Sequence, residues 1–356
     1  MALDRVLGID VGATKVLAYV ARPDEKGENP IHRKHFVCSD HKSLQEIVAK
    51  IQTDSDSKFS HACIAVAGPV TNGRVRLTNL NWAEITKASI AEQLGIDGSR
   101  VKLVNDMVGQ GASLYVLDEN PSNVYHFPDT GIFAGGFRSK NKWSFIAPGG
   151  GFGKSDIFFE PGKNDKVRIS DSEGGHIRFA PANLAEIDLL EYLQRDVNFV
   201  SQETVLQGSA MKRIYDFFLE KYPGHGQPDW LKEAFEREDP SAVITKVAMG
   251  QYEGKHDSHC KLAYDMYCSI LGSVVGDEAI RIKGGVVIGG GIFPKIKDGL
   301  GETDFMHAYK GRDLPGLVTL AGEMPLVGIL NSDAGVIGAT EIAKPINKDI
   351  FEIVTA

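Results

Sequence analysis

The sequence predicts an α/β protein of two lobes with a cleft between them. Its 356 residues suit two domains, since a domain typically has roughly 150 residues. Short apolar runs alternate with helical patterns in the first third of the chain, as they do in α/β proteins. Glycine contributes 39 residues, about 11% of the chain, against roughly 7% in an average protein. This excess indicates sharp turns or places where the backbone approaches a ligand.

The first lobe is expected to begin with a β-hairpin. The apolar segments 5–10 and 15–22 flank a short turn that contains Gly12. Helices are predicted at 43–51 and 89–95, the second ending near Gly95, and buried strands at 62–68 and 101–106. This order predicts a mixed, mostly parallel sheet.

The second lobe is expected to combine a meander of strands with a helical region. Residues 119–145 are loop-rich, and 144–153, 156–160 and 166–170 are predicted antiparallel strands. Residues 184–280 are mainly helical in pattern, and 284–292 is a buried strand that runs into a glycine turn. A last helix at 334–343 can return to the first lobe. We therefore expect a small α/β domain of residues 1–105 plus 334–356 and a large α+β domain of residues 106–333.

Composition excludes several classes of protein. A hydrophobic fraction of 42% and a charged fraction of 24% argue against a disordered chain, a collagen-like repeat or a transmembrane bundle. The net charge of −8 argues against a general nucleic-acid binder, which needs a basic face. Charged residues interrupt the first apolar stretch, so no signal peptide is expected. The four cysteines lack CxxC spacing and are expected to be reduced thiols of a cytoplasmic protein.

Three glycine turns follow apolar runs, at Gly12 to Thr14, Gly149 to Gly153 and Gly289 to Gly291. Beyond the end of a strand, a glycine lets backbone N–H groups approach a phosphate. Each turn alone is weak evidence, because glycine turns usually only close hairpins, whereas three in this order are stronger together. The segment GGGFGKS is not a P-loop, because Pro148 stands where that motif needs glycine and the β-like segment DIFFE follows where a helix should begin.

Two groups of polar residues are candidates for chemistry on a hydroxyl group. Asp106 follows a predicted strand beside Asn105, where a carboxylate can take a proton from an alcohol. The alternative for this pair is a helix N-cap. Glu173 and His176 lie three residues apart in EGGH, and the alternative there is an exposed turn.

These motifs together resemble the bacterial-type glucokinase family, hexose kinases of the actin-like ATPase superfamily. The resemblance runs from about residue 6 to 341 and is carried by LGIDVGATK, AVAGPV with LTNLNW, LVND, EGGHIRFAP, VSQETVLQG, GGVVIGGGIFPK, and KGR ahead of AGVIGA. It implies a two-lobed actin-like ATPase (ribonuclease H-like) fold with the substrate cleft between the lobes. It also implies an ATP- and Mg²⁺-dependent glycolytic kinase that transfers the γ-phosphoryl group to the 6-hydroxyl of D-glucose.

The resemblance also implies roles for individual residues. Asp106 would be the general base, and the residues that hydrogen-bond the other sugar hydroxyls would be Asn105, Glu173, His176 and Glu203. The nucleotide side would comprise Asp10, Gly12, Ala13, Thr14, Gly149, Gly150, Gly151, Gly289 and Gly290. Asp10 would position the water shell of Mg²⁺, which the nucleotide holds without a direct protein ligand. A homodimer is implied as well.

Two positions depart from the family pattern. Gly150 stands where relatives have a threonine whose hydroxyl contacts a nucleotide phosphate, and Ala13 with Lys15 stands where they often have glycine and asparagine. Lys154 is expected to be a solvent-facing strand residue, the alternative being a substitute charge for the nucleotide. These departures leave open a kinase for another hexose or another phosphoryl donor. A sugar-binding regulatory protein with little turnover is the alternative from a different class, and an actin-like filament protein is a more remote one.

Overall fold

A computed structural model describes residues 4–27, 29–77, 80–160, 162 and 166–354. Its strands are β1 (Asp4–Val11), β2 (Lys15–Ala21), β3 (His32–Val37), β4 (Lys58–Val66), β5 (Arg74–Val75), β6 (Ile85–Thr86), β7 (Val101–Asn105), β8 (Val124–His126), β9 (Lys142–Pro148), β10 (Phe152–Glu160), β11 (Lys166–Ser172), β12 (Gly285–Ile288), β13 (Leu326–Ile329) and β14 (Phe351–Val354).

The α-helices alternate with these strands early in the chain and dominate its second half. They are α1 (Leu44–Ser55), α2 (Lys87–Leu94), α3 (Asp106–Ser113), α4 (Leu184–Leu193), α5 (Gln202–Leu206), α6 (Ala210–Lys221), α7 (Asp229–Arg237), α8 (Pro240–Ala248), α9 (Ser258–Ile282), α10 (Phe293–Ile296), α11 (Phe305–Lys310), α12 (Pro315–Glu323) and α13 (Ala334–Ala343). A short 3₁₀ turn, η6 (Gly174–His176), follows β11. The helical region predicted at 184–280 is confirmed.

The first sheet has the strand order β3-β2-β1-β4-β7. The predicted hairpin of β1 and β2 is confirmed, and the Gly12 N–H closes its turn on the Lys15 carbonyl at 2.9 Å. The sheet is mixed, as expected, but the expectation that it is mostly parallel is wrong. β1, β4 and β7 run parallel, but β2 is antiparallel to both β1 and β3, because short connections can join only antiparallel neighbours.

The second sheet has the strand order β14-β11-β10-β9-β12-β13-β8. Its centre is the predicted antiparallel meander of β9, β10 and β11. β12 lies parallel to β9, with Ile288 opposite Ile146, so these two strands end at the same edge of the sheet. At the other side, β14 pairs in parallel with β11.

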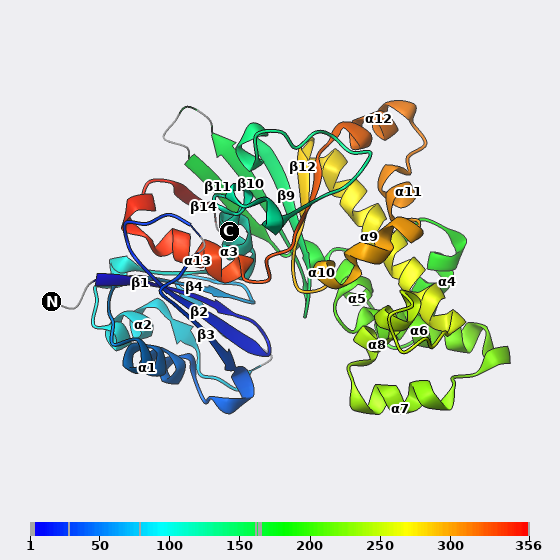
Figure 1. The fold of residues 1–356 in the computed structure, drawn as a ribbon, viewed down its shortest axis with the longest axis horizontal. Coiled ribbons are helices and arrows are strands. Elements are labelled where there is room, and N and C mark those ends of the chain that lie inside the picture. Colours follow the sequence, from blue (N-terminus) through cyan, green and yellow to red (C-terminus); the bar gives the residue numbers. More distant parts are fainter. Residues whose placement is uncertain (1–3, 28, 78–79, 161, 163–165, 355–356) are drawn as a thin grey trace.

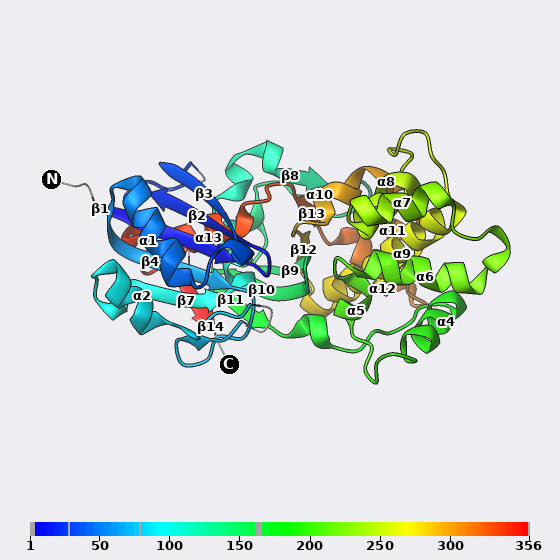
Figure 2. The same cartoon turned by 90° about the horizontal axis from the view of Figure 1, so that it is seen from below.

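The alternation of side chains along the strands builds a layered molecule. In β1, Leu7 and Ile9 pack with α1 and α2, whereas Val6 faces α3 and α13 on the opposite side. In β12, Val287 faces α3 and α13, whereas Val286 and Ile288 face the helical block formed by α4 to α12. The two helices α3 and α13 thus lie between the two sheets (Figure 1), and Figure 2 shows the helical block beyond the second sheet.

The predicted last helix, α13, packs against β1, β4 and α3. The strand β14, which follows it in the chain, joins the second sheet. A Cβ at Gly338 would lie 1.8 Å from the Gly109 carbonyl oxygen, so α13 and α3 approach closely at these two glycines. The division into residues 1–105 plus 334–356 and residues 106–333 stays a proposal.

Candidate active site

Asn105 and Asp106 lie where β7 passes into α3, at the carboxyl end of a parallel strand. Asn105 is the N-cap: its side-chain oxygen accepts from the Met107 N–H at 2.8 Å, and its amide donates to the Gly68 carbonyl at 3.1 Å. Asp106 is the first residue of the helix, and its carboxylate accepts from the same N–H at 3.0 Å. Capping by Asn105 therefore leaves the Asp106 carboxylate only lightly bonded by the protein.

Asp106 and Asp10 form a crowded pair of carboxyl groups. Burial, together with the charge of Asp10, raises the pKa of Asp106 to about 7, and Glu173 adds to the effect. Burial also raises the pKa of Asp10 to about 6; the charge of Asp333 raises it further, whereas Lys15 acts in the opposite direction. The charge of Asp10 in β1 thus acts on Asp106 after β7, although the two residues are 96 apart in the chain.

The sugar-side residues predicted from EGGH and VSQETVLQG come together in space. The His176 ring lies with Nε2 3.6 Å from a Glu173 oxygen and Nδ1 3.9 Å from a Glu203 oxygen. The side chains of Glu173 and His176 are 61% and 59% exposed, which leaves them free to meet a ligand. Glu203 is more enclosed, and its Oε2 accepts from the Phe152 N–H at 2.9 Å.

The glycines around this cluster are required by close contacts. A Cβ at Gly151 would lie 2.7 Å from the Glu203 carboxylate, and one at Gly175 would lie 1.7 Å from the Phe152 carbonyl oxygen. These glycines let the turn after β9, the EGGH turn and the helix α5 pack together. Gly208 strengthens the junction, because its N–H donates to the Gly149 carbonyl at 2.7 Å.

The two glycine turns of the second sheet lie side by side, because they follow the paired strands β9 and β12. The Gly149 N–H closes the first turn on the Gly151 carbonyl at 2.9 Å. Gly290 has a φ of +74°, and a Cβ there would lie 2.5 Å from the Pro148 carbonyl oxygen, so the second turn needs glycine. Gly289 is just as confined, because a Cβ would meet the Phe145 ring at 2.5 Å. Gly150 differs from them: a Cβ there would meet nothing within 4 Å.

The turn of the first sheet, with Ala13 and Thr14 exposed at its tip, is held from behind by Cys38. The Cys38 N–H donates to the Thr14 carbonyl at 2.9 Å, and its thiol lies 3.5 Å from the Gly12 carbonyl oxygen. This turn comes directly after Asp10. The structure thus brings the first glycine turn to the same carboxylate that acts on Asp106.

Two features near Asp10 have no signal in the sequence. Asp333, at the start of α13, accepts from the Tyr19 hydroxyl at 2.7 Å and from Arg33 at 2.5 Å and 2.9 Å. Gln110, one turn after Asp106 in α3, lies beside Asp10. Asp333 reaches the site from a distant part of the chain, and Gln110 reaches it from the inner side of a helix. No local motif marks either residue.

The expectation of a solvent-facing Lys154 is wrong. Lys154 is 4% exposed, and its Nζ lies 2.8 Å from a buried Glu278 oxygen of α9. The same carboxylate pairs with Arg281, and the resulting compensation keeps the pKa of Glu278 below its usual value although burial opposes ionisation. Lys154 is thus committed to the junction of β10 and α9 and does not replace the missing threonine hydroxyl.

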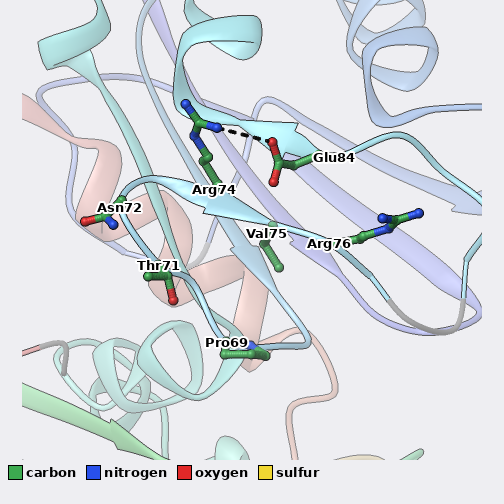
Figure 3. A pocket seen from close by; sticks show the side chains of 7 residues that line it. All are labelled: Pro69, Thr71, Asn72, Arg74, Val75, Arg76 and Glu84. Atoms are coloured by element: carbon green, nitrogen blue, oxygen red, sulfur yellow. Dashed lines mark ion pairs between the residues drawn. The ribbon is translucent and has the colours of Figure 1, made fainter.

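An open hollow of about 520 Å³ lies beside the small β5–β6 ribbon (Figure 3). Arg74 points toward Glu84 at 3.8 Å on one side, and Pro69 borders the hollow on the other. None of the predicted site residues lines it. Of the neighbouring motif LTNLNW, Thr78 and Asn79 lie outside the described residues.

Over the described ranges, the structure shows no group of three or more His, Cys, Asp or Glu side chains arranged to hold a metal ion. Nor does any helix within them have the length and apolar character needed to cross a membrane. The four cysteines are free and buried.

Solved structures share this architecture. The glucokinase of an Antarctic psychrotroph matches with a TM-score of 0.73 at 23% identity, over 94% of this chain and 97% of the other. The glucokinase of Balamuthia mandrillaris, solved in complex with glucose, matches with a TM-score of 0.76 at 18% identity, over 96% and 94%. The predicted fold class, a two-lobed actin-like ATPase fold as found in sugar kinases, is confirmed.

Sequence comparison narrows this class. The family model described as Glucokinase matches residues 7–346. The glucokinase of Nostoc punctiforme is 31% identical over 94% of this chain and 97% of its own, and that of Hahella chejuensis is 28% identical over 94% and 95%. The chain therefore belongs to the glucokinase family. As a member it is an enzyme, a kinase that acts on glucose.

Proposed function

We propose that this chain transfers the γ-phosphoryl group of ATP to the 6-hydroxyl of D-glucose, with Asp106 as the general base. The observation that carries the proposal is the place of Asp106. Its carboxyl group is buried at the start of α3, and burial with the charges of Asp10 and Glu173 raises its pKa to about 7. A base with a pKa near neutral pH is half ionised there and matched to the removal of an alcohol proton.

The sugar would be held by the cluster around His176. Its ring lies between Glu173 and Glu203, so the three side chains present two carboxylates and an imidazole in one place. A hexose presents a ring of hydroxyl donors and acceptors, and a sugar that lacks one of them leaves a polar group of the site unpaired. Asn105 fits a supporting role, because its cap of α3 sets the position of Asp106, and it stays a proposed sugar contact.

The nucleotide phosphates would meet the glycine turns at 12–14, 149–151 and 289–290. Mg²⁺ fits this part of the site, because a cation favours the ionised forms of Asp10 and Asp106, whose pKa values are raised by burial and by neighbouring carboxylates. Bound to the nucleotide, Mg²⁺ neutralises charge on the phosphate oxygens. Asp10 would hold the water shell of that ion.

A solved relative lends support to the nucleotide. The glucokinase of Streptomyces griseus, with a TM-score of 0.62 and 19% identity, was crystallised with glucose and AMPPNP, an ATP analogue. A different phosphoryl donor is the alternative, because the open space at Gly150 lacks the hydroxyl that the family has there. The proposal further includes a homodimer and a cytoplasmic location, the latter supported by the four free thiols.

A coupled assay for glucose 6-phosphate tests the proposal, with Mg²⁺ and ATP, ADP or polyphosphate supplied separately. We expect turnover with ATP, and a loss of about 10²- to 10⁴-fold in kcat for Asp106→Asn with glucose binding retained. Asp216→Asn, which breaks an exposed ion pair of α6, is the matched control and should keep native turnover. Turnover of Asp106→Asn within tenfold of native would remove Asp106 from the role of base. Glucose binding without turnover on any donor would favour a sugar-binding regulator.

A further inference from the structure

The side-chain oxygen of Gln110 is buried and has no hydrogen-bond partner among the described residues. An amide oxygen in that position loses its bonds to water without gaining others, which destabilises the folded protein. Most buried polar atoms have partners, and a bound water, ion or ligand is one explanation of an exception. Gln110 is therefore a candidate for contact with something that enters the site.

The position of Gln110 shows where that contact would be. It lies four residues after Asp106 in α3, which places both side chains on the same face of the helix, one turn apart. A Cβ built at Gly335 would lie 2.6 Å from Asp10 Oδ2 and 3.1 Å from Gln110 Nε2. The Gln110 amide and the Asp10 carboxylate thus border the same space at the start of α13, beside Gly335.

We propose that Gln110 positions the water shell of nucleotide-bound Mg²⁺, its Oε1 accepting a hydrogen bond from a water ligand of the ion while its Nε2 faces Asp10. This inference rests on the proposed function and adds a residue to it. Water bound to Mg²⁺ is a strong donor, and Mg²⁺ keeps several waters in protein sites. An oxygen that is unpaired in the free enzyme gains its partner when the metal nucleotide binds.

Glycine at position 335 is part of the same arrangement. Any side chain there would collide with the Asp10 carboxylate and the Gln110 amide, since both lie within 3.1 Å of its Cβ. The carboxylate of Asp333, two residues earlier, accepts hydrogen bonds from Arg33 and Tyr19, and its charge acts on Asp10. The acceptors left facing the ion's water are Asp10 and Gln110.

Calorimetry with AMPPNP tests the proposal without turnover. The measured quantity is the gain in AMPPNP affinity when Mg²⁺ replaces EDTA. Gln110→Met removes both polar atoms at similar length and should reduce this gain about tenfold or more, the usual effect of losing a residue that orients a metal's ligands. Gln110→Glu keeps an acceptor oxygen and should keep the gain.

Gln202→Met is the matched control. Gln202 also has a buried side-chain oxygen without a partner, but it lies in α5 beside Glu203, on the sugar side. This variant should keep the native gain with Mg²⁺, and glucose binding to Gln110→Met should match the native protein, which shows that the fold is intact. A native gain in Gln110→Met would overturn the proposal, as would the absence of any Mg²⁺-dependent gain in the native protein. Turnover in the donor assay judges the proposed function separately.

Discussion

Asp10 and Asp106 resist ionisation because each is enclosed by protein, and Asp106 also faces the charge of Asp10. This crowding is a cost to the free enzyme and an advantage for catalysis, since it raises the pKa of the base toward neutral pH. The consequence is a specific dependence of the reaction rate on pH.

We expect kcat/KM for glucose to rise with pH through a midpoint near 7, because Asp106 acts as a base only when it is ionised and its pKa is about 7. Asp10→Asn removes the neighbouring charge that raises this pKa. Its remaining activity should therefore rise through a midpoint at lower pH than in the native enzyme. Rate profiles between pH 5 and 9, at Mg²⁺ and ATP concentrations below saturation so that they report the pKa of the free enzyme, provide the measurement. Identical midpoints in the two proteins would mean that Asp10 does not set the pKa of the base.

Gly150 provides the second test at this scale. Threonine fits there, since a Cβ meets nothing within 4 Å and the φ of Gly150 lies outside the left-handed region. A hydroxyl that bonds a phosphate should tighten ATP binding roughly tenfold, as expected for a hydrogen bond to a charged group. Gly150→Val has the same shape without the hydroxyl and should leave the affinity unchanged. Equal ATP affinities in calorimetry for the threonine and valine variants would show that the hydroxyl finds no phosphate.

Single residues also show what the sequence could predict about the site. Glu173, His176 and Glu203 were identifiable because each belongs to a motif, and the structure brings them together. Lys154 was misplaced, because a lysine in a strand is usually exposed and nothing local reveals its partner Glu278, 124 residues away. Gln110 carries no signal either: its significance comes from an unpaired oxygen, which exists only in the folded chain.

At the scale of elements, short apolar runs located the strands β1, β4, β7, β9 and β12, and glycines marked the turns after all of these except β7, which Asp106 follows. The expectation that the first sheet is mostly parallel was wrong because the edge strand β3, which pairs antiparallel with β2, was not predicted. The short edge strands β8 and β14 escaped prediction, since only one residue of each is buried and their apolar pattern is correspondingly weak.

The contact between α3 and α13 provides a test at this scale. Gly338→Ala places a methyl group 1.8 Å from the Gly109 carbonyl oxygen and 2.7 Å from the Ser113 nitrogen, so the helices must move apart. Overpacking of this kind typically costs about 1–3 kcal/mol in the free energy of unfolding. Urea unfolding is the measurement, and Gly316→Ala, with open space around its Cβ at the start of α12, is the control expected to be neutral. Equal stability of the two variants would show that the helices yield without cost.

At the scale of the whole molecule, the proposed site draws on separate layers. Asp106 begins α3, which lies between the sheets, whereas Glu203 lies on α5 in the helical block beyond the second sheet. A sugar that bonds to both would connect these layers. Such closure excludes water, which would otherwise accept the phosphoryl group.

We therefore expect glucose to reduce the radius of gyration of the native protein, as measured by small-angle X-ray scattering. Glu173→Ala should abolish the change at a glucose concentration that just saturates the native protein, because it removes a proposed sugar contact whose side chain is 61% exposed and has little structural role. Glu191→Ala, in α4, leaves the site residues intact, and this variant should show the same glucose-dependent decrease in radius of gyration as the native protein. Calorimetry on the same samples reports how much glucose is bound. Full binding with an unchanged radius of gyration would show that the layers are already in their closed arrangement, and that water must be excluded by the site residues themselves.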